Sequence, residues 1–184
     1  MPLTTLDPVA ALITIDLQNG IVALPLAHPA AEIVARSAQL AAAFRKRGLP
    51  VVLVNVTPVT SNRTDAGPRN LTLPEGWADL VPELDQQPTD HLVTKQRVGA
   101  FIGTGLDEIL RSRGVTQVFV VGIATSIGVE STVRSAFDHG YNVVVVTDAT
   151  TDRDAANHTH SIEKVFPRFA ETDTTENVLK ALAQ

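Results

Sequence analysis

Four short, almost continuous runs of branched apolar residues divide the chain and predict strands. They cover residues 11–16, 51–56, 117–122 and 142–147. A run in which apolar and polar residues do not alternate is typical of a strand covered on both faces, as in a parallel sheet. Weaker runs at residues 91–95 and near 168–172 bring the expected number of strands to six.

Helical patterns between these runs predict four helices, over residues 31–47, 103–113, 126–139 and 174–182. A glycine follows each of the first three, and glycine is the usual residue just past the end of a helix. Strands that alternate with helices form right-handed crossovers and a doubly wound sheet. We therefore expect an α/β fold, a three-layer α/β/α Rossmann-like sandwich around a six-stranded parallel sheet.

Between the second and third strands, residues 57–88 contain five prolines and two glycines. This composition predicts a long irregular excursion, because proline and glycine interrupt regular structure. A loop of this length either covers a pocket or forms a contact between subunits.

Length and charge limit the classes of protein and partner. A chain of 184 residues, 44% of them hydrophobic, suits one domain over residues 1–184. The formal net charge of −5 gives no electrostatic reason to expect nucleic acid or a membrane surface as partner, so we expect a small-molecule substrate. No apolar run approaches the roughly 20 residues that span a bilayer, and no basic segment precedes the first apolar stretch, so we expect a cytoplasmic protein.

The absence of cysteine excludes disulfides, thiolate metal sites and a cysteine nucleophile. No glycine-rich nucleotide-binding string occurs, so no nucleotide cofactor is expected. His158 and His160 lie two residues apart in the expected loop after the fifth strand. Such a pair is more typical of a polar surface than of a zinc site, and we expect neither a metal nor a cofactor.

Candidate chemistry lies at the ends of the strands, because ligands of doubly wound sheets bind beyond the carboxyl ends. Asp16 follows the first strand, where a carboxylate either meets a ligand or orders the loop. Lys95 ends the third strand on the same side; a solvated lysine is the more common case, and pairing with Asp16 would argue for a functional one. The segment 121–132 leads from the fourth strand through a turn of small residues into a helix near Ser126, whose first N–H groups could hold an anion.

Three segments at these strand ends carry a family resemblance. Residues 15–19 read Ile-Asp-Leu-Gln-Asn, residues 94–97 read Thr-Lys-Gln-Arg, and residues 122–128 read Gly-Ile-Ala-Thr-Ser-Ile-Gly. In this order they resemble the signature segments of the isochorismatase-like hydrolases, within the cysteine hydrolase superfamily. The resemblance covers almost the whole chain and implies the strand order 3-2-1-4-5-6. Relatives of this kind commonly assemble, so a homo-oligomer, a dimer or a tetramer, is expected.

The resemblance also implies a catalytic set. Members that are nicotinamidases or carbamoyl amidohydrolases act through an aspartate, a lysine and a cysteine nucleophile, whose positions fall on Asp16, Lys95 and Gly128 here. Gly128 has no side chain with which to attack. True isochorismatases also have glycine at this position, which implies hydrolysis of a vinyl ether with Asp16 as general acid. Two alternatives stay open: a binding or scaffold protein on the hydrolase fold, and an amidase that uses Ser126 or Thr125.

The candidate substrate-binding residues come from the same strand ends. They are Gln18, Asn19, Arg97, Phe101, Ile123, Ala124, Thr125 and Ile127. Gln18 and Asn19 could instead order the loop after the first strand. A dicarboxylate substrate would need cationic partners, and by loop position Arg63, Arg69 and Arg97 are the nearest arginines to the expected site. The resemblance implies a cis peptide bond between Ile123 and Ala124. Burial would raise the pKa of Asp16 and a nearby Lys95 would lower it, and the pattern of residues does not decide which prevails.

Overall fold

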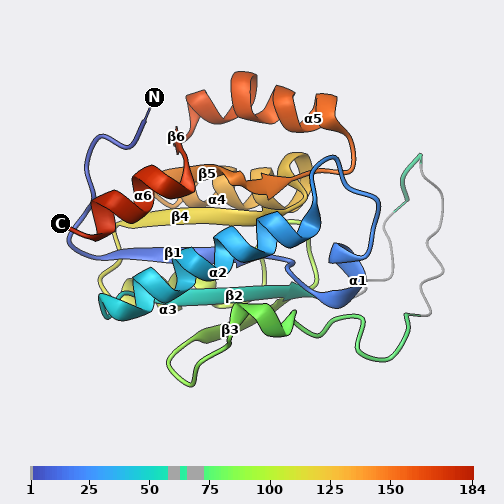
Figure 1. The fold of residues 1–184 in the computed structure, drawn as a ribbon, viewed down its shortest axis with the longest axis horizontal. Coiled ribbons are helices and arrows are strands. Elements are labelled where there is room, and N and C mark those ends of the chain that lie inside the picture. The colour runs from blue at the N-terminus through green and yellow to red at the C-terminus, as the bar shows by residue number, and fades with distance from the viewer. Residues whose placement is uncertain (1, 58–62, 66–72) are drawn as a thin grey trace.

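A computed structural model describes residues 2–57, 63–65 and 73–184, and it confirms the α/β fold (Figure 1). The six strands are β1 (Ala10–Ile15), β2 (Val51–Val56), β3 (His91–Lys95), β4 (Gln117–Ile123), β5 (Asn142–Thr151) and β6 (Glu171–Asp173). They form one sheet in the order β3-β2-β1-β4-β5-β6, and every neighbouring pair is parallel. The expected strand order is therefore confirmed.

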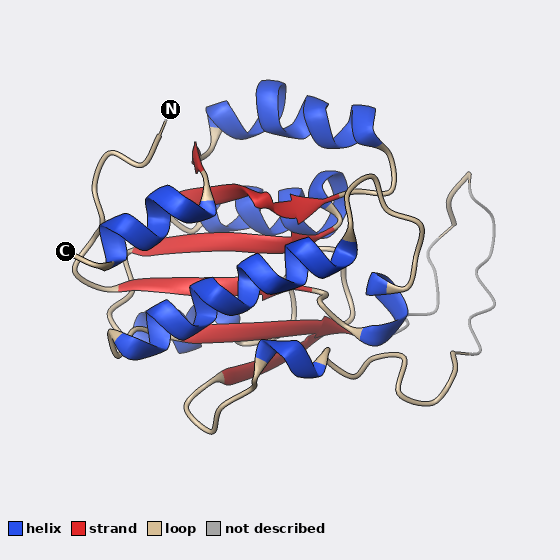
Figure 2. Ribbon diagram, viewed as in Figure 1, coloured by secondary structure: helices blue, strands red, loops and turns tan. Residues whose placement is uncertain are grey.

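Helices cover both faces of the sheet, as Figure 2 shows. The front layer consists of α2 (Ala30–Lys46) and α6 (Thr175–Leu182), and the rear layer of α3 (Leu106–Ser112) and α4 (Glu130–Asp138). Two shorter helices, α1 (Asn19–Val22) and α5 (Ala155–His160), follow β1 and β5. Within the described part of the chain, no helix has the length and apolarity needed to cross a membrane.

The central strands separate two hydrophobic cores. All six residues of β1 are buried, and they point alternately to the two faces. Leu12 packs into the core beneath α2, and Ile13 into the core beneath α3 and α4. This burial on both faces explains why the strands read as continuous apolar runs.

Several boundaries differ from the sequence prediction. The helix expected over 103–113 begins at Leu106, because Gly103 and Gly105 adopt left-handed φ angles of 71° and 73° that end a helix rather than start one. The sixth strand lies at Glu171–Asp173, after a 3₁₀ turn at Phe166–Arg168.

The helix expected over 126–139 has two parts, a π-helical turn at Thr125–Val129 and α4. The segment expected to be a loop after the fifth strand is helical at Ala155–His160 and continues as a π-helical turn at Ser161–Val165. Its start is capped by Asp154, which accepts hydrogen bonds from the N–H groups of Ala156 and Asn157.

The excursion after β2 is partly described. Residues 58–62 and 66–72, and with them Arg69, lie outside the described residues. Leu80 forms an isolated antiparallel bridge with Gln18, and a 3₁₀ turn follows at Pro82–Leu84. The amide of Gln18 donates to the carbonyls of Val56 and Trp77 and accepts from the N–H of Val56. These contacts fasten the excursion to the carboxyl ends of β1 and β2.

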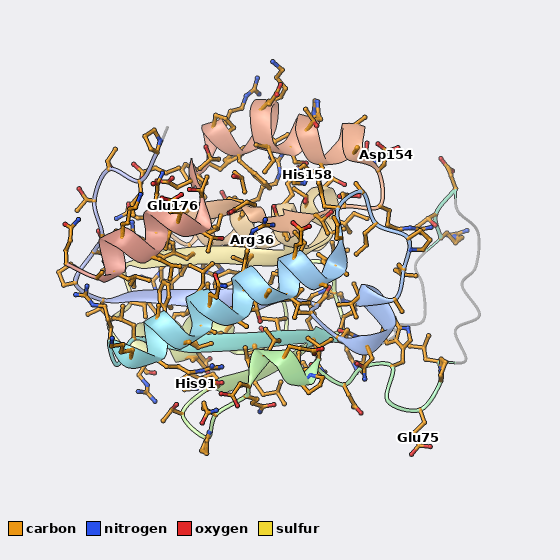
Figure 3. The ribbon with its side chains drawn as sticks, in the orientation of Figure 1. Arg36, Glu75, His91, Asp154, His158 and Glu176 are labelled. Atoms are coloured by element: carbon orange, nitrogen blue, oxygen red, sulfur yellow. The ribbon has the colours of Figure 1, made fainter. Side chains whose placement is uncertain are left out.

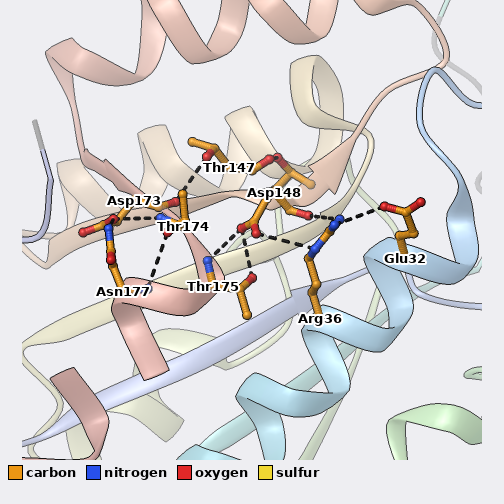
Figure 4. A network of polar contacts seen from close by, with 9 residues as sticks. Glu32, Arg36, Thr147, Asp148, Asp173, Thr174, Thr175 and Asn177 are labelled. Carbon is orange, nitrogen blue, oxygen red and sulfur yellow. Dashed lines mark hydrogen bonds and ion pairs between the residues drawn. The ribbon is translucent and has the colours of Figure 1, made fainter. Parts of the chain in front are cut away.

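A polar network joins β5 to the two helices of the front layer (Figure 4). Asp148 accepts hydrogen bonds from the backbone N–H and hydroxyl of Thr175, at 2.8 and 2.9 Å. Arg36 of α2 lies 3.5 Å from the same carboxylate and donates to the Asp148 carbonyl. The network therefore fixes the start of α6 and the middle of α2 against the sheet.

We predict that Asp148→Ala lowers the free energy of unfolding by about 1–3 kcal/mol, because it leaves the buried donors of Thr175 without an acceptor. The matched control is Lys180→Ala, which removes the exposed ion pair of Lys180 with Glu176 on the same helix. Urea unfolding should give a lower midpoint for the first variant and the wild-type midpoint for the control. Equal midpoints for all three proteins would contradict the prediction.

Candidate active site

Asp16 lies in a sharp turn directly after β1. Its φ angle of 53° is in the left-handed region, and its N–H still donates to the carbonyl of Val54 at 2.9 Å. On the other side, β4 comes so close that a Cβ on Gly122 would lie 2.1 Å from the Ile15 carbonyl oxygen. Only glycine allows this approach. The two neighbouring strands therefore hold the turn from both sides, and the side chain of Asp16 is buried.

Lys95, the last residue of β3, forms a buried ion pair with Asp16. Its Nζ lies 2.8 Å from Asp16 Oδ2, and the two side chains are 3% and 8% exposed. Nζ also lies 3.4 Å from the carbonyl oxygen of Arg97. The lysine reaches past the end of β2 to meet the aspartate, so the structure brings together the two residues that sequence analysis placed at one edge of the sheet.

Burial prevails over the lysine in setting the protonation of Asp16. Desolvation raises the pKa of Asp16 from its ordinary value to about 6, and the attraction and hydrogen bond of Lys95 only partly offset it. Oδ2 accepts from Lys95, whereas Oδ1 is buried without a hydrogen-bond partner among the described residues. A proton on Asp16 therefore belongs on Oδ1, the oxygen that the lysine does not occupy.

Gly128, in the turn after β4, lies beside the Asp16–Lys95 pair. A Cβ built on Gly128 would lie 3.4 Å from Asp16 Oδ2 and 3.1 Å from Ile15 Cγ2. A side chain at this position would therefore touch the carboxylate and press on Ile15, so the Gly128 backbone lies close beside Asp16. The peptide bond between Ile123 and Ala124 is cis, as expected. Asp16, Lys95 and Gly128 thus converge at the carboxyl ends of β1, β3 and β4.

The hydroxyls in the same turn are directed away from Asp16. Thr125 Oγ1 lies 2.8 Å from His158 Nδ1, and Ser126 Oγ donates to Asp152 Oδ2 at 2.8 Å. The N–H of Ser126 is also bound by Asp152, at 2.7 Å, so it is not available to an anion as sequence analysis expected. Neither hydroxyl is hydrogen-bonded to Asp16, and a serine or threonine nucleophile needs a base within hydrogen-bond reach of its hydroxyl.

Sequence analysis missed Asp152 and misplaced His158. Asp152 has no motif of its own and lies five residues beyond the predicted strand end at 147, because β5 continues to Thr151, so no sequence signal singled it out. His158 lies on α5, not in a loop, and its ring is half-buried (Figure 3). His160 is exposed. In the ranges that the structure describes, no three His, Asp or Glu side chains are grouped as metal ligands.

The other candidate residues occupy different environments. Gln18 and Asn19 bind the backbone of the excursion, the second through a hydrogen bond to the Gly76 carbonyl at 3.2 Å, so the loop-ordering alternative describes their contacts. Phe101 is 7% exposed and stacks on His139, with ring centroids 5.1 Å apart, within the rear core.

The last candidates differ in exposure. Ile123 and Thr125 are buried, Ala124 is half-buried, and Ile127, Arg63 and Arg97 are exposed.

Comparison with known proteins agrees with this fold. Residues 10–177 match the isochorismatase domain. The chain therefore belongs to the isochorismatase family, whose members are hydrolases.

Two relatives match over nearly their whole length. The uncharacterized isochorismatase family protein YecD of Escherichia coli O157:H7 is 40% identical over 94% of this chain and 95% of its own. An isochorismatase family protein of Burkholderia thailandensis, with a solved structure, is 42% identical and superposes with a TM-score of 0.93 over 98% of both chains. N-carbamoylsarcosine amidase from Thermoplasma acidophilum shares the fold with a TM-score of 0.76 at 26% identity, over 91% of this chain and 97% of its own.

We predict that Asp16→Asn destabilises the protein by about 3–5 kcal/mol, because it leaves the buried ammonium of Lys95 without its counter-ion. The double variant Asp16→Asn/Lys95→Met should recover most of this loss, since no buried charge remains. Denaturant unfolding of both single variants and the double variant measures the coupling. Additive losses would mean that the two groups do not interact in the folded protein.

Proposed function

We propose that the protein hydrolyses a vinyl ether of a small organic acid, of the isochorismate type, without a covalent intermediate. The observation that carries the proposal is the unpartnered Oδ1 of Asp16, an oxygen of a buried carboxyl group whose other oxygen binds Lys95 and lies beside Gly128. A carboxyl group with a pKa of about 6 is a competent general acid near neutral pH. A chain without cysteine lacks the thiol that acyl transfer in this superfamily uses.

In the proposed reaction, the Oδ1 proton of Asp16 passes to the terminal carbon of the vinyl ether. The C=C electron pair forms the new C–H bond, and positive charge develops on the carbon attached to the ether oxygen. Water attacks this oxocarbenium ion and returns a proton to Asp16. The resulting hemiketal then breaks its C–O bond to release an alcohol and a 2-oxo acid, so the enzyme ends in its starting state.

Lys95 has two roles in this scheme. Its ammonium stabilises the carboxylate that Asp16 becomes after it gives up its proton, through the 2.8 Å contact to Oδ2. It also keeps the lone pairs of Oδ2 engaged, so that the proton is carried by Oδ1. Gly128 adds no side chain beside the carboxylate, and because a Cβ there would already press on Ile15, a larger residue would crowd a bound substrate.

An amidohydrolase reaction is the second candidate, and the names of relatives favour it. Ureidoacrylate amidohydrolase RutB of Agrobacterium fabrum is 46% identical over 71 residues, which are 39% of this chain and 31% of its own. For such a reaction Asp16 would act as a base toward water. The engagement of Thr125 by His158 and of Ser126 by Asp152 argues against a hydroxyl nucleophile.

The pH dependence of turnover separates an acid role of Asp16 from a base role. If Asp16 is the acid, we expect kcat/KM to be constant below pH 6 and to fall about tenfold per pH unit above it, because the protonated form is lost above its pKa of about 6. A base role gives the opposite sign, with the rate rising through the same pH range. Pyruvate release from isochorismate, followed from about pH 5 to pH 8, measures the profile.

Variants test the roles of the same two residues. Asp16→Asn should lower turnover by about 100-fold or more, and Lys95→Ala should lower it while moving the pH at which the rate falls to a higher value. Each variant counts as folded if its thermal unfolding midpoint lies well above the temperature of the assay. Wild-type protein that releases no pyruvate at any pH would sink the vinyl-ether assignment.

A second prediction concerns the space at Gly128. Gly128→Ala keeps an allowed helical backbone, but its methyl group needs Ile15 to move by a few tenths of an ångström and lies beside Asp16. We expect a folded protein whose kcat/KM is at least about tenfold lower, because a small displacement of substrate from the acid is costly. Gly128→Ser should lose more than Gly128→Ala. Unchanged kinetics in both would show that the substrate does not use this space.

A further inference from the structure

A second buried carboxylate lies behind the turn that carries Gly128. Asp152 is 2% exposed, and its Oδ2 accepts the N–H and the hydroxyl of Ser126 at 2.7 and 2.8 Å. Its Oδ1 accepts the N–H groups of Arg153 and Asp154 at 2.7 and 3.5 Å. In the described ranges, no lysine or arginine nitrogen lies within ion-pair distance of it.

The charge of Asp152 therefore depends on hydrogen-bond donors, and two of them belong to Ser126. Hydrogen bonds to an ionised carboxylate are short and about twice as strong as neutral ones. A buried carboxylate without these donors would be costly, so movement of Ser126 away from Asp152 is penalised. Asp152 thus fixes the first part of the π-helical turn Thr125–Val129 to the end of β5.

A second contact holds the same turn from α5. His158 Nδ1 lies 2.8 Å from Thr125 Oγ1, and the ring of His158 meets His28 edge-on with centroids 4.7 Å apart. His28 in turn lies 2.9 Å from Thr151 Oγ1. Burial, with a smaller contribution from His28, lowers the pKa of His158, so the ring is neutral near pH 7 and its Nδ1 can accept the hydroxyl proton of Thr125.

Both contacts hold residues just before Gly128, namely Thr125 and Ser126. Neither contact involves Asp16 or Lys95. Asp152 and His158 come from the segment after β5, whereas Asp16 and Lys95 come from β1 and β3. Two side-chain contacts from the segment after β5 therefore hold the part of the turn that leads to Gly128. The hydroxyl of Thr132 donates to the Gly128 carbonyl at 2.7 Å and holds the glycine itself. The N–H of Ala27 donates to the Asp152 carbonyl at 2.8 Å and so fixes the backbone of Asp152 to the loop before α2.

We propose that Asp152 is a positioning residue for the Asp16 site, acting through Ser126, and that His158 supports it in parallel through Thr125. The inference rests on the proposed function in taking Asp16 as the acid. Asp152 keeps the turn against Asp16 and so excludes water from the carboxyl group. Loss of this attachment lets water reach Asp16, and its pKa moves back toward the ordinary value of an aspartate.

The test is a titration of the Asp16 carboxyl carbon by ¹³C NMR in the free protein, for wild type, Asp152→Ala, Asp152→Asn and Asp154→Ala. We expect the Asp16 midpoint to fall in Asp152→Ala from about 6 toward 3.8. Asp152→Asn keeps an acceptor for the Ser126 N–H and should lie closer to wild type. Asp154→Ala removes an equal charge two residues away, where the carboxylate caps α5 and does not contact Ser126, and should titrate as wild type.

Two results would overturn the inference: a wild-type Asp16 midpoint in folded Asp152→Ala, or an equal shift in Asp154→Ala, which would indicate a general effect of charge. If Asp152→Ala does not fold, Thr125→Val/Ser126→Ala removes a hydroxyl from each attachment at almost unchanged volume, and its Asp16 midpoint decides in the same way. The titration needs no substrate. A shifted midpoint in a protein that releases no pyruvate would therefore leave the positioning role intact and contradict only the proposed reaction.

Discussion

The buried ion pair between Asp16 and Lys95 is the constraint on which the site depends. Two charges removed from water are costly unless they lie in contact, and these are 2.8 Å apart. In the register of the sheet Ile15 is level with Val54 and Val93, so β3 extends two residues beyond the end of β1 to place Lys95 beside Asp16, which turns with a φ angle of 53°. The register of three strands is thus coupled to one contact at their carboxyl ends.

The sheet supplies rigidity for this pair, and a separate part of the chain supplies its cover. β1 is buried along its whole length, and neighbours on both sides pair with it, so Asp16 has little freedom to move. Gly128 belongs to a π-helical turn held by side-chain contacts to Asp152 and His158. Backbone pairing in the sheet therefore fixes the position of Asp16. Polar side-chain contacts hold the turn beside it, which carries Gly128.

This division explains what the sequence could predict. The six strands and their order follow from continuous apolar runs and from the resemblance, because burial on both faces leaves a strong pattern. Asp16 and Lys95 could be placed at one edge because parallel strands end together. The helical segment from Ala155 to Val165 was missed because its residues are largely polar, and Asp154 and contacts with the rear core stabilise it rather than a clear amphipathic period. Phe101 was grouped with the site by its neighbours along the chain, but its ring packs against His139.

In the proposed reaction no side chain beside Asp16 acts as a nucleophile, and this determines which protonation state of the buried carboxyl group is useful. A nucleophile beside Asp16 would need the aspartate as a base, and a raised pKa would then reduce the fraction of molecules ready to act. Without a nucleophile, the same burial favours the form that can donate. In this proposal Lys95 determines which oxygen donates the proton, because it binds Oδ2 and leaves Oδ1 without a partner among the described residues. The lysine lowers the pKa of Asp16 less than burial raises it. In an acid role, Lys95 therefore contributes by selecting the oxygen that carries the proton as well as by its charge.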